Sequence, residues 1–140
     1  MPFSDLREFL KFLEEHGELL KTKKPVDTKF EISSYIRKTS DQRGPALFFE
    51  NVKNFDMPVV GGIFATRERA FLALETSSQD YVHKFQNALD HLLPPKLVSN
   101  APCKDVIHTG NDVDLTRLPI PIFSEKDPAA FITLGLSISR

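Results

Sequence analysis

Apolar residues recur with helical spacing near the start of the chain. The positions i, i+3, i+4 and i+7 are occupied by Leu6, Phe9, Leu10 and Leu13. Ser4 is suited to cap the amino end of such a helix, and Gly17 is placed to end it. The pattern predicts an amphipathic helix between these two residues.

Three further helices are predicted from the same kind of pattern. Asp27 is expected to cap a second helix, which Arg43-Gly44-Pro45 ends and whose apolar stripe is Ile32, Tyr35 and Ile36. Thr66 is expected to cap a third, over Arg67 to Glu75. A capping-box-like start at 77–80 predicts a fourth, over Tyr81 to Leu93, which Pro94-Pro95 ends. Its stripe is Tyr81, Phe85, Leu89 and Leu92.

Short apolar runs bounded by turn residues predict strands between these helices. The runs cover residues 18–22, 46–49, 58–64 and 105–108. We expect the runs at 46–49 and 58–64 to be neighbouring buried strands. We also expect a turn at Gly110-Asn111-Asp112 and a second turn at Leu115-Thr116-Arg117, which Asp114 caps.

The composition and pattern of the sequence change beyond about residue 110. The prolines of Leu118 to Phe123 exclude a helix and a central strand, so this stretch is interpreted as a surface linker, followed by a polar loop over 124–130. Phe131 to Arg140 then alternates as a half-buried strand does, with Ile132, Leu134, Leu136 and Ile138 on one face. Because an uncovered strand edge is a liability, we expect this chain to be the front of a longer one.

Composition excludes several classes of protein. The 140 residues are 41% hydrophobic and 26% charged, with 18 basic and 19 acidic residues giving a net charge of −1, so nothing favours nucleic acid as a partner. Cys103 is the single cysteine, which excludes an internal disulfide and favours the cytoplasm. We expect neither a membrane span nor a signal peptide, because no apolar run approaches the roughly 18 residues required.

Two groups of residues could carry chemistry. Gly61-Gly62 leads into a helix start beside Arg67 and Arg69, where a phosphate could bind, but no phosphate-loop fingerprint is present. Two glycines closing a strand before an exposed first helical turn are the simpler interpretation. Asp112 and Asp114 with His108 could form a hard-ion site, but turn-closing and capping roles explain them more simply.

The remaining reactive side chains indicate no catalytic centre. His16, His83 and His91 lack a partner in sequence, and Cys103 lacks an assignable base. The loop Ser124 to Pro128 has the composition of a solvated loop, although substrate lids also occur in such places.

Taken in order, several segments resemble one family, the UbiD-family decarboxylases. The segments are Asp5 to Leu10, Glu18-Leu19, Gly44 to Lys53, Ala65 to Arg69, Ala101 to Cys103, Asp112 to Leu115, Leu118 to Pro121 and Ile132 to Gly135. These enzymes use prenylated FMN to add or remove carboxylate on aromatic, heteroaromatic or α,β-unsaturated acids.

The resemblance implies a mixed α/β (α+β) fold in two parts. Residues 1–110 would form the N-terminal α/β domain, and residues 111–140 a linker and the first strand of a split β-barrel of the flavin-reductase type, truncated here. The family's flavin-strand Asn and Arg, its metal-holding His and Glu, and its catalytic Glu-Arg-Glu set all follow the Ile-Thr-x-Gly strand. The one implied cofactor contact in this chain is therefore Thr133, for which β propensity is an equally good explanation without the resemblance.

The resemblance also implies a function. We expect the N-terminal fragment of a cytoplasmic, homo-oligomeric carboxy-lyase, inactive alone, with prenylated FMN, manganese and potassium bound by the full-length enzyme and a flavin prenyltransferase as cofactor supplier. The alternative is a non-catalytic binding or assembly subunit of a multi-subunit carboxylase or decarboxylase.

Overall fold

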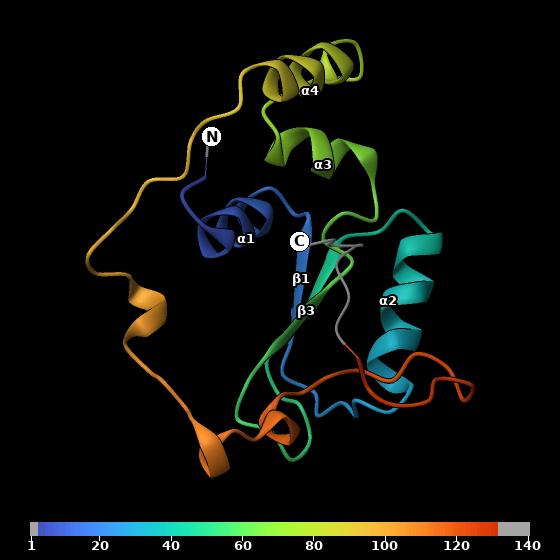
Figure 1. Ribbon diagram of the computed structural model, residues 1–140. Helices are drawn as coiled ribbons and strands as arrows, with labels where there is room; N and C mark the ends of the chain where they lie inside the picture. Colours follow the sequence, from blue (N-terminus) through green and yellow to red (C-terminus); the bar gives the residue numbers. More distant parts are fainter. Residues whose placement is uncertain (1–2, 132–140) are drawn as a thin grey trace.

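The computed structural model describes residues 3–131, which include a small mixed sheet with a helix packed against each face (Figure 1). The helices and strands are α1 (Leu6–Glu15), β1 (Leu19–Thr22), α2 (Glu31–Asp41), β2 (Ala46–Phe49), β3 (Val59–Gly61), α3 (Arg67–Ala73) and α4 (Tyr81–Asp90). Three short 3-10 turns follow at Pro102–Lys104, Gly110–Asp112 and Leu115–Arg117. Within the described residues, no helix combines the length and the apolar character that crossing a bilayer requires.

The sheet has the order β1-β2-β3, with β2 in the centre. β1 and β2 are parallel, with Leu19 opposite Ala46, and α2 makes the crossover that a parallel pair requires. β2 and β3 are antiparallel, with Phe49 opposite Val59. The expected pairing of these two strands is confirmed, although β3 is shorter than the predicted run of 58–64.

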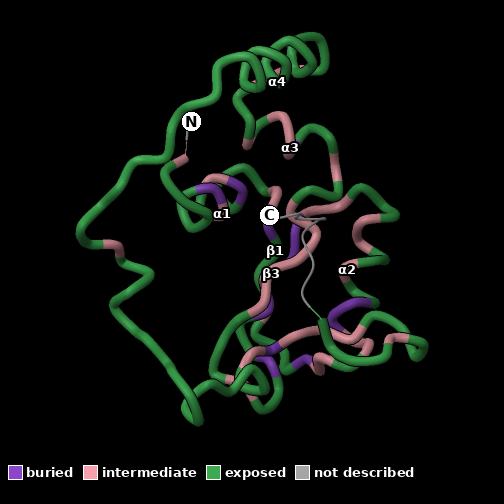
Figure 2. Tube along the Cα trace, viewed as in Figure 1, coloured by how far each residue is buried: buried purple, intermediate pink, exposed green. Residues whose placement is uncertain are grey.

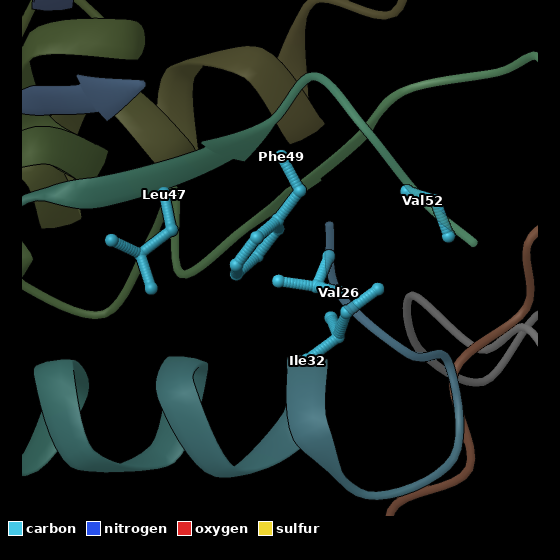
Figure 3. Close-up of a cluster of buried hydrophobic side chains, with 5 residues drawn as sticks. All are labelled: Val26, Ile32, Leu47, Phe49 and Val52. Carbon is cyan, nitrogen blue, oxygen red and sulfur yellow. The ribbon is translucent and has the colours of Figure 1, made fainter. Parts of the chain in front are cut away.

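Alternation along β2 builds a hydrophobic core on each face of the sheet. One core contains Val26, Ile32, Leu47, Phe49 and Val52 and lies against α2 (Figure 3). The other contains Phe9, Leu13, Leu19 and Ala46 and lies against α1. Because side chains of a strand point alternately to opposite faces, the four residues of β2 serve both cores.

The predicted first helix is confirmed, but its cap is one residue later than expected. Asp5, not Ser4, is the N-cap, and its Oδ1 accepts a hydrogen bond from the Glu8 amide at 2.9 Å. Ser4 instead donates to the Glu8 carboxylate through both its amide and its hydroxyl, each at 2.7 Å. Asp5 and Ser4 therefore both bond to Glu8, in an arrangement similar to a capping box. Gly17 follows the helix with φ of +73°, as a terminating glycine does.

The second helix starts later than Asp27 predicts. α2 begins at Glu31, after Phe30 in a left-handed conformation with φ of 65° and no side-chain cap. Asp27 accepts a hydrogen bond from the Lys29 amide at 2.8 Å, and its own amide donates to the Glu31 carboxylate at 2.8 Å. Asp27 thus closes the turn that precedes the helix, and its carboxylate does not cap the helix itself.

The strand predicted over 105–108 is wrong. Val106 and Ile107 are 71% and 70% exposed, and in the described part of the chain this stretch joins no sheet. An apolar run without a partner strand has no ladder of hydrogen bonds to hold it extended. The expected turn at Gly110–Asp112 is present as a 3-10 turn.

The proline-rich linker returns to the body of the protein at Ile122. The carbonyl of Ile122 accepts hydrogen bonds from the Phe30 amide at 3.1 Å and from the Ser33 hydroxyl at 3.1 Å. The Ile122 amide donates to the Thr28 carbonyl at 3.0 Å. This stretch is therefore anchored beside the start of α2. The strand predicted over Phe131 to Arg140 lies outside the described residues from residue 132 onward.

Candidate functional site

The turn between β3 and α3 does not offer a free phosphate site, because Arg69 is already bound. This side chain is 1% exposed and donates to the Glu18 carboxylate at 2.7 Å. It also donates to the carbonyls of Ile63 at 2.9 Å and Gly62 at 3.2 Å. The guanidinium thus links the turn to the segment before β1. Thr66 caps α3 as predicted, by accepting from the Arg69 amide.

The expectation that Arg69 lies on an exposed helical turn is wrong, because its side chain is buried. Arg67, two residues earlier, is exposed as expected. Glu18, at the junction of α1 and β1, is the counter-charge that could have indicated a partner for Arg69. However, 51 residues separate the two side chains in sequence. Local spacing cannot identify a pair of this kind.

The acidic group around Asp112 lines a surface hollow. Residues 54–57, between β2 and β3, lie opposite residues 108–118 across a space of about 740 Å³. His108, Asp112 and Asp114 are all among the lining residues. Even so, the described residues contain no cluster of three or more histidine, cysteine or acidic side chains placed to hold a metal ion. The hollow therefore brings these residues to one surface without forming a metal centre.

Asp114 has the structural role that the sequence favoured. Its Oδ1 accepts hydrogen bonds from the Thr116 hydroxyl at 2.6 Å and the Thr116 amide at 2.9 Å. These bonds, the hydroxyl first, lower the pKa of the Asp114 carboxyl below its usual value. The carboxylate is thus held as a cap on the turn at Leu115–Arg117.

A second hollow of about 610 Å³ lies between α2 and the linker. Its lining residues are Ser33, Ser34, Arg37, Lys38, Asp41, Gln42 and Phe123. The Arg37 guanidinium donates to the Asp41 carboxylate at 2.9 Å, and this bond raises the pKa of Arg37. Ser33 and Ser34 both donate to the Phe30 carbonyl. Ser33 donates to the Ile122 carbonyl as well, and among these lining residues no nucleophile faces a general base.

The other candidate side chains are separate from one another. His16 lies with its Nδ1 2.8 Å from the Phe12 carbonyl and its ring stacked on that of Phe12. His91 is similarly placed, 3.0 Å from the Asn87 carbonyl. His83 and Cys103 are exposed. The described residues bring none of these groups into a catalytic pair.

Thr133, the one predicted cofactor contact, lies outside the described residues. The structure does show how the chain approaches it. Asp127 closes the polar loop by accepting from the amides of Phe123 at 3.1 Å and Ser124 at 2.9 Å. With Ile122 anchored beside α2, this loop fixes the course of the chain as far as Phe131.

Two family profiles match the chain in succession. Residues 10–89 match the N-terminal domain of 3-octaprenyl-4-hydroxybenzoate carboxy-lyase, and residues 96–140 match the Rift-related domain of the same family. Together, the two matches extend over α1 to α4 and the linker that follows.

Solved structures give the same result. The chain is similar to an evolved dimeric form of the UbiD-class enzyme HmfF from Pelotomaculum thermopropionicum, in complex with prFMN, at 34% identity and a TM-score of 0.78 over 87% of this chain and 28% of that one. It is also similar to vanillic acid decarboxylase of Sedimentibacter hydroxybenzoicus in its closed form (29% identity, TM-score 0.76, 88% of this chain and 28% of that one). A third similar structure is the apo 3,4-dihydroxybenzoic acid decarboxylase of Enterobacter cloacae. It has 29% identity and a TM-score of 0.74, over 87% of this chain and 28% of that one. The chain spans less than a third of the length of each.

Proposed function

This chain belongs to the UbiD family, and on that premise we propose that it forms the N-terminal part of a prenylated-FMN-dependent carboxy-lyase. The observation that carries the proposal is the ordered match of both family domains within one chain, together with 34% identity to a structure that contains prFMN. The substrate class is an aromatic or α,β-unsaturated carboxylic acid. The named neighbours act on vanillic and 3,4-dihydroxybenzoic acids, which are both aromatic carboxylic acids.

The described residues do not by themselves fit the flavin or its metal. They contain no metal-ligating cluster, and the one buried guanidinium among them is already paired with Glu18. We therefore assign prenylated FMN, with manganese and potassium, to the larger part of the full-length enzyme. When bound, prenylated FMN supplies the electron sink for decarboxylation. The contribution of residues 1–110, as the N-terminal α/β domain, is to carry the segment of residues 111–140.

Thr133 is the residue of this chain that we assign to the cofactor. It lies in the region that matches the Rift-related domain, which we propose to be the start of the split β-barrel. The described anchor at Ile122 supports this proposal, because it fixes the chain eleven residues before Thr133. The comparisons do not favour the alternative of a non-catalytic assembly subunit, since the relatives named above are enzymes.

The reading frame that encodes Arg140 provides the first test. We expect it to continue with the flavin-strand Asn and Arg and with the later Glu-Arg-Glu set. Its full-length product should then release carbon dioxide from an aromatic acid when supplied with prenylated FMN and manganese. A stop codon directly after Arg140 would count against the proposal.

The 140-residue chain alone provides the second test. After incubation with prenylated FMN and manganese, followed by gel filtration, we expect no flavin absorbance with the protein peak and no decarboxylation. Stoichiometric flavin retention with turnover would show instead that these residues are sufficient for the reaction. In the full-length product, Thr133→Val should weaken flavin retention, while Thr116→Val, in a capped surface turn, should not.

A further inference from the structure

Residues 78–117, here called the arc, leave the body of the protein after α3 and return to it at the linker (Figure 1). No residue of the arc is buried, and Figure 2 shows it exposed along almost its whole course. It is nevertheless rich in large apolar side chains. More than half of the surface of each of the following is exposed: Val82, Phe85, Leu89, Leu92, Leu93, Leu97, Val98, Val106, Ile107, Val113 and Leu115.

The orientation of α4 is set by its first turn. The ring of Tyr81 lies 5.4 Å from that of Phe71 in α3, and the Lys84 ammonium donates to the Glu75 carbonyl at 3.0 Å. Beyond these contacts the apolar stripe is open to solvent, with Phe85 67% and Leu89 58% exposed. An amphipathic helix whose apolar stripe is exposed in this way has the form of a contact surface.

The arc is not a peculiarity of this chain. It accounts for 40 of the 140 residues, so a structural match that covers 87% of the chain must include part of it. That match has a TM-score of 0.78 to a protein whose chain is several times longer. At least part of the arc therefore recurs in a structure that has far more chain with which to cover it.

The position of the family domains indicates what covers α4. The Rift-related match begins at residue 96, within the arc and six residues after α4 ends at Asp90. Elements that are consecutive in sequence usually pack side by side. The arc carries four basic and five acidic residues, so its charge favours neither nucleic acid nor an anionic membrane as the occupant.

We propose that the first part of the arc, residues 78–95, is the docking surface for the Rift-related domain of the full-length enzyme, and that the stripe of Phe85 and Leu89 on α4 is its central contact. This inference rests on the proposed function, since the occupant is the remainder of that carboxy-lyase. Residues 78–95 would then hold the N-terminal α/β domain against the cofactor-bearing domain.

The test compares amide hydrogen exchange of α4 in the 140-residue chain and in the full-length product of the reading frame. We expect exchange to slow by about 100-fold in the longer protein, because packing has to open before the amides meet water. The variant Phe85→Asp/Leu89→Asp should abolish this protection and lower the Tm of the full-length product, while leaving the Tm of the 140-residue chain unchanged. The matched control is His83→Asp/Asn87→Asp, which adds the same charge at the same spacing on the opposite face and should leave the protection intact.

Two results would overturn the docking surface. The first is unprotected α4 amides in a full-length product whose near-ultraviolet circular dichroism shows packed side chains. The second is concentration-dependent self-association of the 140-residue chain that Phe85→Asp/Leu89→Asp removes and the control does not, which would assign the stripe to a second copy. Exchange is measured without substrate, so a full-length product that is protected at α4 but does not decarboxylate would count against the proposed function alone.

Discussion

At the scale of single residues, the buried Arg69 connects two parts of the chain that are 51 residues apart in sequence. Its three acceptors belong to the segment before β1 and to the turn before α3. A guanidinium has five donors in a fixed plane and no neutral form at ordinary pH, so a buried one must be surrounded by acceptors. This residue therefore fixes the geometry of the turn rather than binding a ligand.

We expect Arg69→Met to lower the free energy of unfolding by about 2–3 kcal/mol. The loss is below the usual upper range for a broken buried pair because the Glu18 side chain is 46% exposed and can be solvated by water. Urea denaturation of the 140-residue chain measures the change. Arg67→Met, at an exposed site, should change the free energy of unfolding by less than about 0.5 kcal/mol. Equal effects of the two substitutions would contradict the role given to Arg69.

Glu8 makes the first helix sensitive to acid. Hydrogen bonds from the Ser4 amide, and then from the Ser4 hydroxyl, lower the pKa of Glu8 below its usual value of 4.5. A carboxyl whose pKa is lowered by folding contributes stability that is present above pH 4.5 and lost as the pH falls through the lowered value. We expect Glu8→Gln to be less stable than the wild type at pH 7, with the difference shrinking below about pH 4.5. Thermal unfolding of the variant and the wild type at pH 7, 5 and 3 measures the difference in stability. Glu15→Gln, at the other end of α1, is the control. A difference between Glu8→Gln and the wild type that does not change with pH would refute the prediction.

At the scale of elements, prediction succeeded where local pattern decides the structure. The run of Ala46 to Phe49 has the bounds of β2, and Thr66 and Asp114 cap the turns that follow them. It failed where a distant partner decides, as in the missing strand at Val106 and the burial of Arg69. The candidate site shows the same limit: Thr133 was named from the family resemblance, not from local chemistry, and it lies outside the described residues.

The crossing of β3 and α2 depends on a glycine. A Cβ at Gly61 would lie 2.2 Å from Cδ1 of Ile36, so an added methyl group forces the helix or its side chain to move. We expect Gly61→Ala to cost about 1–3 kcal/mol of stability. Ile36→Val removes Cδ1 but keeps Cγ1, which would lie 2.7 Å from the added Cβ, so it should recover part of that loss in the double variant.

A matched control for this pair exists at Gly17. Its φ of +73° disfavours alanine, but no atom lies within 4 Å of where the Cβ would be. The cost of Gly17→Ala, about 1–2 kcal/mol from backbone strain, should therefore be unchanged by Ile36→Val. Additive effects of Gly61→Ala and Ile36→Val in a double-mutant cycle would show that the two residues do not meet.

At the scale of the whole molecule, the chain divides into a packed body and the arc. The body holds both cores and the anchored linker, whereas the arc holds no buried residue. Backbone with few buried contacts opens at little cost in free energy and is cut first by proteases.

Limited trypsin digestion of the 140-residue chain should therefore cut first after Lys96 and Lys104, in the arc, and only later after Lys29 or Arg69, in the body. Mass spectrometry of the early fragments identifies the sites. The fragment that contains Ile122 should stay with the body on gel filtration, because its hydrogen bonds to residues 28–33 are independent of the arc. Early cleavage within α2 would contradict this division.

The central place of β2 has a consequence for how the body denatures. The four residues of this strand contribute to the cores on both faces and pair with both other strands, so neither half of the body can persist once β2 has left the sheet. We therefore expect one cooperative unfolding transition, with circular dichroism and Tyr fluorescence changing together. The arc has little surface left to expose, so the slope of stability against urea should be that of a chain of about 100 residues rather than 140.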